Sequence, residues 1–380
     1  MGSDGWLYFN ETLDDYLGRN VLSDRGIHNC AKVLSLLQEN AEEQGCEFVF
    51  AVAPNKNSLY PENMPAYYVK ESRINNYELL KKELEKQEVS YVDLHTLFRQ
   101  NETVMYHKMD THWNNQGASL VCDSILNYIG KSHVDYSKEA NHIEKNFTAD
   151  LQRMLYPKSS EQDENVIYER THTYHFINGA ESTEDMEIET ASEGKQGTLV
   201  MFRDSSGNAL IPYIADEYGT AYFTKAVPYD WTTLAEYQAD TAIIEIAERH
   251  ISSLQEEIPV MMAPQRTIES MVSIAENSCT SVEIEELEDY ILVYGSVDEA
   301  VTDIDSAIYV RLTGAENTYV YEAFPASYEG ALESESPDYN YGLYINASEM
   351  EVGEYELDVI TQKENAYCSS GSLEIYHKSE

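Results

Sequence analysis

The sequence predicts an α/β domain built on a mostly parallel sheet, followed by a small β-sandwich at the C-terminus. In the first two thirds of the chain, near-continuous apolar runs alternate with segments whose apolar residues recur at helical spacing. This alternation is typical of parallel strands joined by helices. After Pro259 the pattern changes to short strands with period-2 alternation, which is typical of a sandwich. The length of 380 residues suits two or three domains.

The predicted elements of the first domain begin with a helix over 23–45, which stops at Gly45. Residues 47–53 form an apolar run that ends before Pro54 and is typical of a strand buried on both faces. By the same criteria the later elements are helices at 76–87, 116–128, 208–218 and 234–238, and strands at 89–94, 197–202, 220–224 and 241–247. Between about 131 and 197 a polar, acidic segment predicts an insertion of short strands and mobile loops.

The C-terminal part of the chain predicts strands separated by turns that contain Gly, Asn and Ser. The predicted strands cover 290–294, 307–312, 318–321, 341–345, 355–360 and 373–376. We therefore expect two domains: an α/β domain at 1–262, with its insertion at about 131–197, and an accessory β-sandwich at 265–380.

The charge balance excludes two classes of partner. The chain carries 68 acidic and 25 basic residues, a net charge of −43, so it repels phosphate backbones and anionic lipid headgroups. Nucleic acids and membrane surfaces are therefore not expected as partners. The acidity favours a well-solvated extracellular surface over specific binding of a cation or a basic partner. Thirty tyrosines against nine phenylalanines suit exposed sheet faces and also carbohydrate contacts, and both interpretations stay open.

Cysteine usage and the start of the chain bear on the compartment. Five cysteines show no CxxC spacing, and their odd number excludes complete pairing within the chain. Cys30, Cys46 and Cys122 lie in patterns typical of buried positions, whereas Cys279 and Cys368 could pair. No transmembrane run or signal peptide is present, and apolar residues begin almost at once, which predicts that a targeting segment has been trimmed. We therefore expect an extracellular or cell-surface protein.

Two separated segments carry the residue types that nucleophilic catalysis needs. Asp110 and His112 lie two positions apart, so they share a face of an extended strand, although contact between them requires a backbone bend. An aspartate beside an imidazole fixes its tautomer, as a general base requires. Ser205 lies between an apolar strand and a predicted helix, where its hydroxyl is exposed and free N–H groups can stabilise an oxyanion. Together these residues form the parts of a Ser-His-Asp triad.

Simpler interpretations stay open for the same residues. Asp110 and His112 also fit an ordinary solvated strand end. Ser206 and Asn208 also fit plain helix caps, and Ser206 is the nearest rival of Ser205 as the nucleophile. The histidines show no metal-ligand spacing such as His-x-x-x-His, so we expect no metal site and no cofactor.

Several separated segments resemble one known family. They are Gly5–Tyr8, Ala53–Lys56, Tyr60–Pro61, Met109–Asn114 with Gly117–Ala118, Phe202–Leu210 and Glu248–His250. Together they resemble the DHHW-type family of the SGNH-hydrolase superfamily, which is similar to the alginate O-acetyltransferases. The resemblance covers about residues 3–252. It implies an acyl-transfer domain with a flavodoxin-like sheet, in which Ser205 is the nucleophile, His112 the general base and Asp110 its orienting partner.

Three residues depart from the family pattern. Arg203 stands where the nucleophile segment of the wider superfamily usually has glycine, and this change could alter the oxyanion pocket. Ser206 stands where an aromatic residue is common, and Thr111 stands where the motif usually has its first histidine. These two changes leave the expected triad intact.

Further residues are candidates for substrate binding or for the oxyanion pocket: Ser206, Asn208, Arg249 and Lys56. Arg249 follows a predicted buried strand and could steady a carboxylate or a sugar, but an ion pair with Glu248 or another acid fits it equally well. Lys56 could lie near the pocket, although a solvated lysine is the simpler interpretation.

The resulting hypothesis is an extracellular serine O-acyltransferase of bacterial type, an O-acetyltransferase that modifies a cell-surface or secreted polysaccharide. Its partners are then a polysaccharide acceptor and an acyl donor, for which a membrane acyl-donor protein is one candidate. One alternative is a carbohydrate esterase with the same triad. Another is a catalytically silent surface module whose tyrosine-rich sandwich binds glycan or protein.

Overall fold

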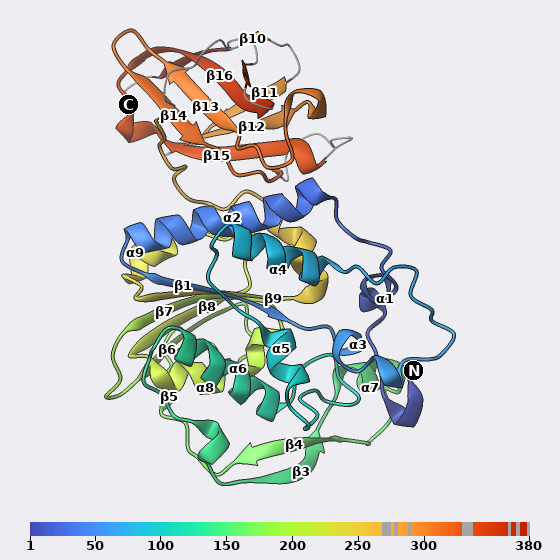
Figure 1. Ribbon diagram of the computed structural model, residues 1–380. Coiled ribbons are helices and arrows are strands. Elements are labelled where there is room, and N and C mark those ends of the chain that lie inside the picture. The colour runs from blue at the N-terminus through green and yellow to red at the C-terminus, as the bar shows by residue number, and fades with distance from the viewer. Residues whose placement is uncertain are drawn as a thin grey trace. The chain divides into compact units, whose positions relative to one another are not determined.

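The computed structural model describes residues 1–267, 275–276, 280–287, 290–328, 337–363, 366–369 and 373–377 (Figure 1). The chain forms two compact units. The first contains Met1–Val21, Ala41–Ala226 and Thr233–Ile251, and the second contains Leu22–Asn40, Val227–Thr232 and Ser252–Glu380. The domain limits expected from the sequence, 1–262 and 265–380, stay a prediction.

A seven-stranded mixed sheet forms the centre of the first unit. In order across the sheet its strands are β2 (Tyr91–Val92), β1 (Glu47–Ala53), β9 (Thr241–Ala247), β7 (Thr198–Arg203), β8 (Thr220–Thr224), β6 (Glu187–Ser192) and β5 (Tyr174–Phe176). The first five run parallel, and β6 and β5 continue the sheet in antiparallel pairing. The predicted α/β class with a mostly parallel sheet is therefore confirmed.

The central strands are buried because both of their faces carry apolar side chains. Val49, Met201 and Ile243, from β1, β7 and β9, have no exposed surface. They share one core with Val121 and Ile125 of α6 (Asn115–Tyr128), and Figure 1 shows α6 and α8 against the same face of the sheet. Since β7 and β9 are parallel neighbours, their carboxyl ends meet at one edge of the sheet.

The helices predicted from the sequence are found with one clear correction, and the described residues contain four short α-helices that were not predicted. The α-helices are α1 (Leu13–Leu17), α2 (Asp24–Glu43), α3 (Lys56–Leu59), α4 (Asn76–Lys86), α5 (Leu94–Arg99), α6, α7 (Asp150–Leu155), α8 (Ile211–Ile214) and α9 (Thr233–Tyr237). The single helix expected at 208–218 is instead three short pieces: the 3-10 turn η5 (Ser206–Ala209), then α8, then η6 (Ala215–Glu217). Pro212 supplies no backbone N–H, which favours a helix start at this point over a continuous helix.

Within the described ranges, all but one of the remaining 3-10 segments are three residues long. They are η1 (Ser3–Gly5), η2 (Asn10–Thr12), η3 (Pro61–Asn63), η4 (Tyr136–Lys138), η7 (Glu248–Gln255), η8 (Glu299–Val301), η9 (Pro337–Tyr339) and η10 (Ala347–Glu349). The region expected to be an insertion contains the antiparallel pair β3 (Asn141–Phe147) and β4 (Asp163–Tyr168), with α7 between them. Its last strands, β5 and β6, belong to the central sheet.

The second unit contains two β-sheets over one apolar core. One sheet has the order β10 (Ala275–Glu276), β17 (Ala366–Ser369), β16 (Gly353–Lys363), β13 (Tyr309–Thr313) and β14 (Thr318–Glu322), with β18 (Leu373–His377) paired to β16. The other contains β11 (Thr280–Glu286), β12 (Tyr290–Val297) and β15 (Asn340–Asn346). Val293, Leu312, Leu343 and Leu357 are fully buried in the shared core. This agrees with the predicted β-sandwich.

Three of the cysteines can be compared with their predictions. Cys30, Cys46 and Cys122 are buried, as predicted. The question of a bond between Cys279 and Cys368 lies outside the described residues. Among the helices of the described ranges, none combines the length and the apolar character needed to cross a lipid bilayer.

Candidate active site

A bent loop, and not an extended strand, carries the Asp-x-His motif. Its ends are joined by a bridge between Tyr106 and Trp113 and by a hydrogen bond from the His107 N–H to the His112 carbonyl, 3.2 Å. The chain between these ends turns back on itself, so Asp110 can reach the ring of His112. This is the bend that the two-residue spacing requires.

Both carboxylate oxygens of Asp110 accept hydrogen bonds, and one of them binds the imidazole of His112. Its Oδ1 accepts hydrogen bonds from the His112 backbone N–H (2.9 Å) and from His112 Nδ1 (2.8 Å), and its Oδ2 accepts one from the Asp150 N–H (2.6 Å). The residue is only 2% exposed. Burial alone raises its pKa, but the hydrogen bond and charge of His112 and the two backbone N–H groups outweigh burial and lower it. Asp110 is therefore ionised at neutral pH.

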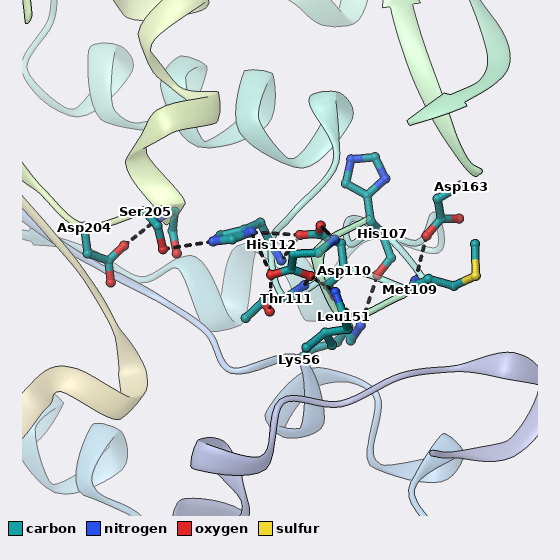
Figure 2. A network of polar contacts seen from close by, with 12 residues as sticks. Lys56, His107, Met109, Asp110, Thr111, His112, Leu151, Asp163, Asp204 and Ser205 are labelled. Atoms are coloured by element: carbon teal, nitrogen blue, oxygen red, sulfur yellow. Dashed lines mark hydrogen bonds and ion pairs between the residues drawn. The ribbon is translucent and has the colours of Figure 1, made fainter. Parts of the chain in front are cut away.

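Figure 2 shows the imidazole of His112 between Asp110 and Ser205. Its Nε2 lies 2.9 Å from Ser205 Oγ. Because Nδ1 donates to Asp110, Nε2 carries the lone pair and accepts the hydrogen bond of the hydroxyl. Burial lowers the pKa of His112, but the hydrogen bond and charge of Asp110, with smaller effects of Asp150 and Asp204, raise it above its ordinary value. The ring is thus arranged to take a proton from the hydroxyl.

Asp204 fixes the turn that presents Ser205; this turn, residues 204–209, is called the serine turn below. Its Oδ1 accepts the Ser206 N–H (2.7 Å), and its Oδ2 accepts the Ala247 N–H (2.7 Å) and contacts His250 Nδ1 (3.0 Å). These bonds tie the end of β7 to the end of β9. Burial opposes its ionisation, but the hydrogen bond from His250 and the bond from Ser206 lower the pKa of Asp204 to about 2. No role was predicted for Asp204 or His250 from the sequence.

The backbone N–H groups of the serine turn differ in whether they already donate a hydrogen bond within the protein. The Ser206 N–H is committed to Asp204, whereas the Ser205 N–H donates no hydrogen bond within the described residues. Asn208 belongs to η5, and its Oδ1 accepts a hydrogen bond from Arg203 Nη1. Within the described residues, the Ser205 N–H and the amide NH₂ of Asn208 are therefore two donors close to the hydroxyl in sequence for which no acceptor is found.

Asp150, the first residue of α7, is a second carboxylate beside the imidazole that sequence reasoning missed. Its Oδ1 accepts the Thr111 N–H (2.9 Å), and its Oδ2 accepts the Thr111 hydroxyl (2.6 Å) and lies 3.8 Å from His112 Nδ1. Burial, followed by the charge of Asp110, raises the pKa of Asp150. The only sequence signal was an acidic residue in the first turn of a helix, which is too common to mark a site.

The same carboxylates bear on metal binding. One ligand atom each from Asp110, His112 and Asp150 lie within 4.8 Å of one another. Hydrogen bonds from backbone N–H groups and from Thr111 already occupy their carboxylate oxygens. A cation would have to displace these bonds, so the arrangement favours a proton relay over a metal centre.

Lys56 supports the catalytic loop from inside the protein. Its side chain is 5% exposed, and its Nζ donates to the backbone carbonyls of His107 (3.2 Å), Lys108 (3.1 Å) and Asp110. Burial lowers its pKa to about 8. The simpler interpretation of a solvated lysine is therefore wrong. Because its three hydrogens bind backbone, Lys56 holds the loop and has no donor left for a substrate.

Arg249 faces a small cavity next to the serine turn. The cavity holds about 10 Å³, and its walls include Phe9, Lys56, Thr111, Ser206 and Arg249. Glu248 is not the partner of Arg249: it accepts hydrogen bonds from the Asn55 N–H and the Ser58 hydroxyl and lies 3.3 Å from His95. The candidates Lys56, Ser206 and Arg249 thus surround one space.

A second, open cavity of about 1340 Å³ lies elsewhere in the first unit. Lys108, Met109 and Asp163 are among its lining residues. Asp110, His112 and Ser205 do not line it, so its size is not evidence about the reaction.

Comparisons with known proteins agree with this fold. Residues 1–174 match the family model of the SGNH hydrolase-like domain of the acetyltransferase AlgX. The first domain of this chain is SGNH hydrolase-like. The predicted resemblance to this group, and with it the predicted fold class, is confirmed. Among curated proteins, none matches the chain significantly.

Solved structures with the same fold include PatB1 of Bacillus cereus, with a TM-score of 0.51 and 16% identity over 66% of this chain and 96% of PatB1. The structure of PatB1 with a sulfonyl adduct has a TM-score of 0.50 and 17% identity over the same shares. A DHHW family protein of Eubacterium siraeum is also similar, with a TM-score of 0.46 and 13% identity over 59% of this chain and 86% of that protein.

Proposed function

We propose that this protein is an extracellular serine O-acyltransferase that transfers an acetyl group to a polysaccharide. The observation that carries the proposal is the hydrogen-bonded series from Asp110 through His112 (2.8 Å) to the Ser205 hydroxyl (2.9 Å). This geometry lets an imidazole activate a serine for covalent catalysis. The match of residues 1–174 to the domain of an acetyltransferase supports acetyl as the group transferred.

The first half-reaction acetylates Ser205. Its Oγ attacks the carbonyl carbon of the donor ester, its proton passes to Nε2 of His112, and the π electron pair moves to the carbonyl oxygen. The bond between that carbon and the donor's ester oxygen then breaks, and His112 returns the proton to the departing oxygen. Asp110 stays ionised throughout and stabilises the imidazolium.

The second half-reaction is the same sequence with a new nucleophile. A sugar hydroxyl gives its proton to His112 Nε2 and attacks the carbonyl carbon of acetyl-Ser205. The bond to Oγ breaks, Oγ recovers the proton, and the sugar leaves as an O-acetyl ester. The free enzyme is regenerated without a cofactor.

The negative charge on the carbonyl oxygen needs donors in both half-reactions. The Ser205 N–H has no acceptor within the described residues, which makes it one candidate. The side-chain NH₂ of Asn208 is a second candidate. Arg249, which shares a cavity with Ser206, would act on the charge or on the bound sugar.

The extracellular setting, the polysaccharide acceptor and a separate acyl donor, such as a membrane acyl-donor protein, belong to the same proposal. The net charge of −43 supports a highly solvated surface and disfavours polyanionic partners such as nucleic acid. The tyrosine-rich strands of the sandwich would provide carbohydrate contacts.

A carbohydrate esterase with the same three residues is the second candidate. It is favoured by the accessibility of the His112 side chain, which is 25% exposed, because water could then replace the sugar hydroxyl. The two activities differ in their products, since the esterase releases acetate whether or not a glycan acceptor is present.

The test combines turnover, labelling and product analysis. Purified protein is incubated with p-nitrophenyl acetate, with and without polysaccharide, and a sulfonyl fluoride is used to label the nucleophile. We expect turnover, labelling of Ser205, and O-acetyl groups on the glycan; Ser205→Ala should abolish all of these. Wild-type protein that neither turns over nor reacts with the probe would refute catalysis and favour the silent binding module.

A further inference from the structure

Arg203 directly precedes the serine turn and stands where the nucleophile segment of the SGNH-hydrolase superfamily usually has glycine. It is the last residue of β7, pairs in register with Glu245 of β9, and is only 4% exposed. Its Nη1 donates to Asn208 Oδ1, and its Nη2 donates to the carbonyl of Asp185 at 2.8 Å. A buried guanidinium thus links the sheet, the serine turn and the segment before β6.

The contact with Asn208 determines which way the side-chain amide faces. A guanidinium only donates hydrogen bonds, so it can bind the Oδ1 of an amide but not its NH₂. The two ends of a planar amide point in different directions. Arg203 therefore holds Oδ1 on its own side and directs the NH₂ of Asn208 away from itself.

Asn208 also lies on the same face of the turn as Ser205. The two residues are three positions apart in a 3-10 turn, and the Asn208 N–H donates to the Ser205 carbonyl at 3.3 Å. In a 3-10 helix, side chains at positions i and i+3 are eclipsed. The amide and the hydroxyl therefore project from the same side of the turn, and the orientation of the amide decides whether it presents a donor or an acceptor on that side.

Close packing keeps Arg203 in this position. A Cβ placed on Gly207 would lie 2.7 Å from Arg203 Cβ and 2.8 Å from Glu245 Oε2. Glu245 has no exposed surface, and neither of its carboxyl oxygens has a hydrogen-bond partner within the described residues. Burial raises the pKa of Glu245 well above its ordinary value, and the charge of Asp204 adds to this. Within the described residues the guanidinium makes no hydrogen bond to Glu245 and bonds to Asn208 and to the Asp185 carbonyl instead.

We propose that Arg203 is a positioning residue that turns the Asn208 amide so that its NH₂ stabilises the oxyanion formed at Ser205. This inference rests on the proposed function and assigns its oxyanion donor. It also gives a role to the residue that stands in place of the superfamily's glycine.

The test is a double-mutant cycle on acetylation of Ser205. Asn208→Ala removes the donor and should lower kcat about 10²-fold with little change in KM, because an oxyanion donor acts in the transition state. Arg203→Met removes the orienting group and should lower kcat by more than twofold, but by less than Asn208→Ala. Arg203→Lys, which keeps a cation and a donor, should fall between Arg203→Met and wild type.

Non-additivity separates positioning from a structural role. In the Asn208→Ala background, Arg203→Met should cause no further loss of kcat. Arg25→Met is the matched control, because Arg25 is also buried (3% exposed) but belongs to the second unit; it should alter thermal stability without changing kcat.

The outcomes distinguish this inference from the proposed function. Wild-type protein without turnover or Ser205 labelling refutes the function itself. An active wild type in which a folded Arg203→Met variant keeps its kcat within twofold, or in which the two losses multiply independently, refutes only the role of Arg203.

Discussion

Replacing Asp110 with asparagine tests the series of hydrogen bonds from Asp110 through His112 to Ser205, because the bonds that Asp110 accepts cannot all be kept by an amide. Three N–H groups converge on this carboxylate: the backbone N–H and Nδ1 of His112 on Oδ1, and the Asp150 N–H on Oδ2. An asparagine has only one oxygen, so one side of the new amide must direct its NH₂ at a donor.

Both orientations of the new amide are unfavourable. If the oxygen faces His112, the NH₂ opposes the Asp150 N–H and leaves a buried donor unpaired, at about 1–3 kcal/mol. If the NH₂ faces His112, Nδ1 must become an acceptor, and the proton moves to Nε2. Nε2 then cannot accept the proton of Ser205. A wrong tautomer of this kind costs up to ~10⁴-fold in kcat, or about 5.4 kcal/mol.

Asp150 should reduce this loss. Its Oδ2 lies 3.8 Å from His112 Nδ1, so a second carboxylate beside the ring favours the tautomer with the proton on Nδ1. We therefore expect Asp110→Asn to lower kcat/KM for p-nitrophenyl acetate by about 10²- to 10⁴-fold. The variant should remain folded by circular dichroism.

Asp163→Asn is the matched control for Asp110→Asn. Asp163 is also buried and accepts a backbone N–H of the same loop, from Met109 at 2.7 Å, but it does not contact the imidazole. The control should retain activity within about tenfold. If the folded Asp110→Asn variant is as active as this control, Asp110 does not orient the base and the reasoning fails.

Three further predictions concern the same site. Activity should rise with pH through the pKa of His112, above the ordinary ~6.5, because the base must be neutral and Asp110 favours its charged form; a profile flat from about pH 5 to 8 would exclude a histidine base. Lys56→Met leaves buried carbonyls unpaired and should lower the free energy of unfolding by about 1–3 kcal/mol in urea titrations, whereas the exposed Lys158→Met should change it by less than about 0.5 kcal/mol. Thr111→Val removes the hydroxyl bond to Asp150 and should lower kcat severalfold while KM stays constant; an equal rise in KM would indicate substrate binding instead.

Local pattern was sufficient to predict the elements that carry the site. The apolar runs at 47–53, 197–202 and 241–247 became β1, β7 and β9, because strands buried on both faces need apolar residues at nearly every position. Ser205 was predicted at a strand-to-helix corner, and it does lie between the end of β7 and the start of the 3-10 turn η5. The prediction of one continuous helix after Ser205 was wrong, because the chain forms three short helical segments there instead.

The residues that sequence reasoning missed act through contacts between distant segments. Asp150 comes from the polar region before β4, and no periodicity connects it with Thr111, 39 positions earlier. Lys56 carries the charge of an ordinary surface lysine, and only the fold shows that backbone carbonyls surround it. The sequence alone showed that Arg203 departs from the glycine usual in the superfamily. Its bond to Asn208 could not be predicted, because it depends on the turn that packs Gly207 against Arg203.

The most direct test of the central claim is to trap the acyl-enzyme. Protein is mixed with p-nitrophenyl acetate, quenched in acid so that His112 is protonated, digested, and analysed by mass spectrometry. The proposed mechanism predicts one added acetyl group on the peptide that contains Ser205. This acetyl group should be absent in Ser205→Ala and strongly reduced in Asp110→Asn. Turnover without acetyl on that peptide, or with acetyl on another residue, would contradict it.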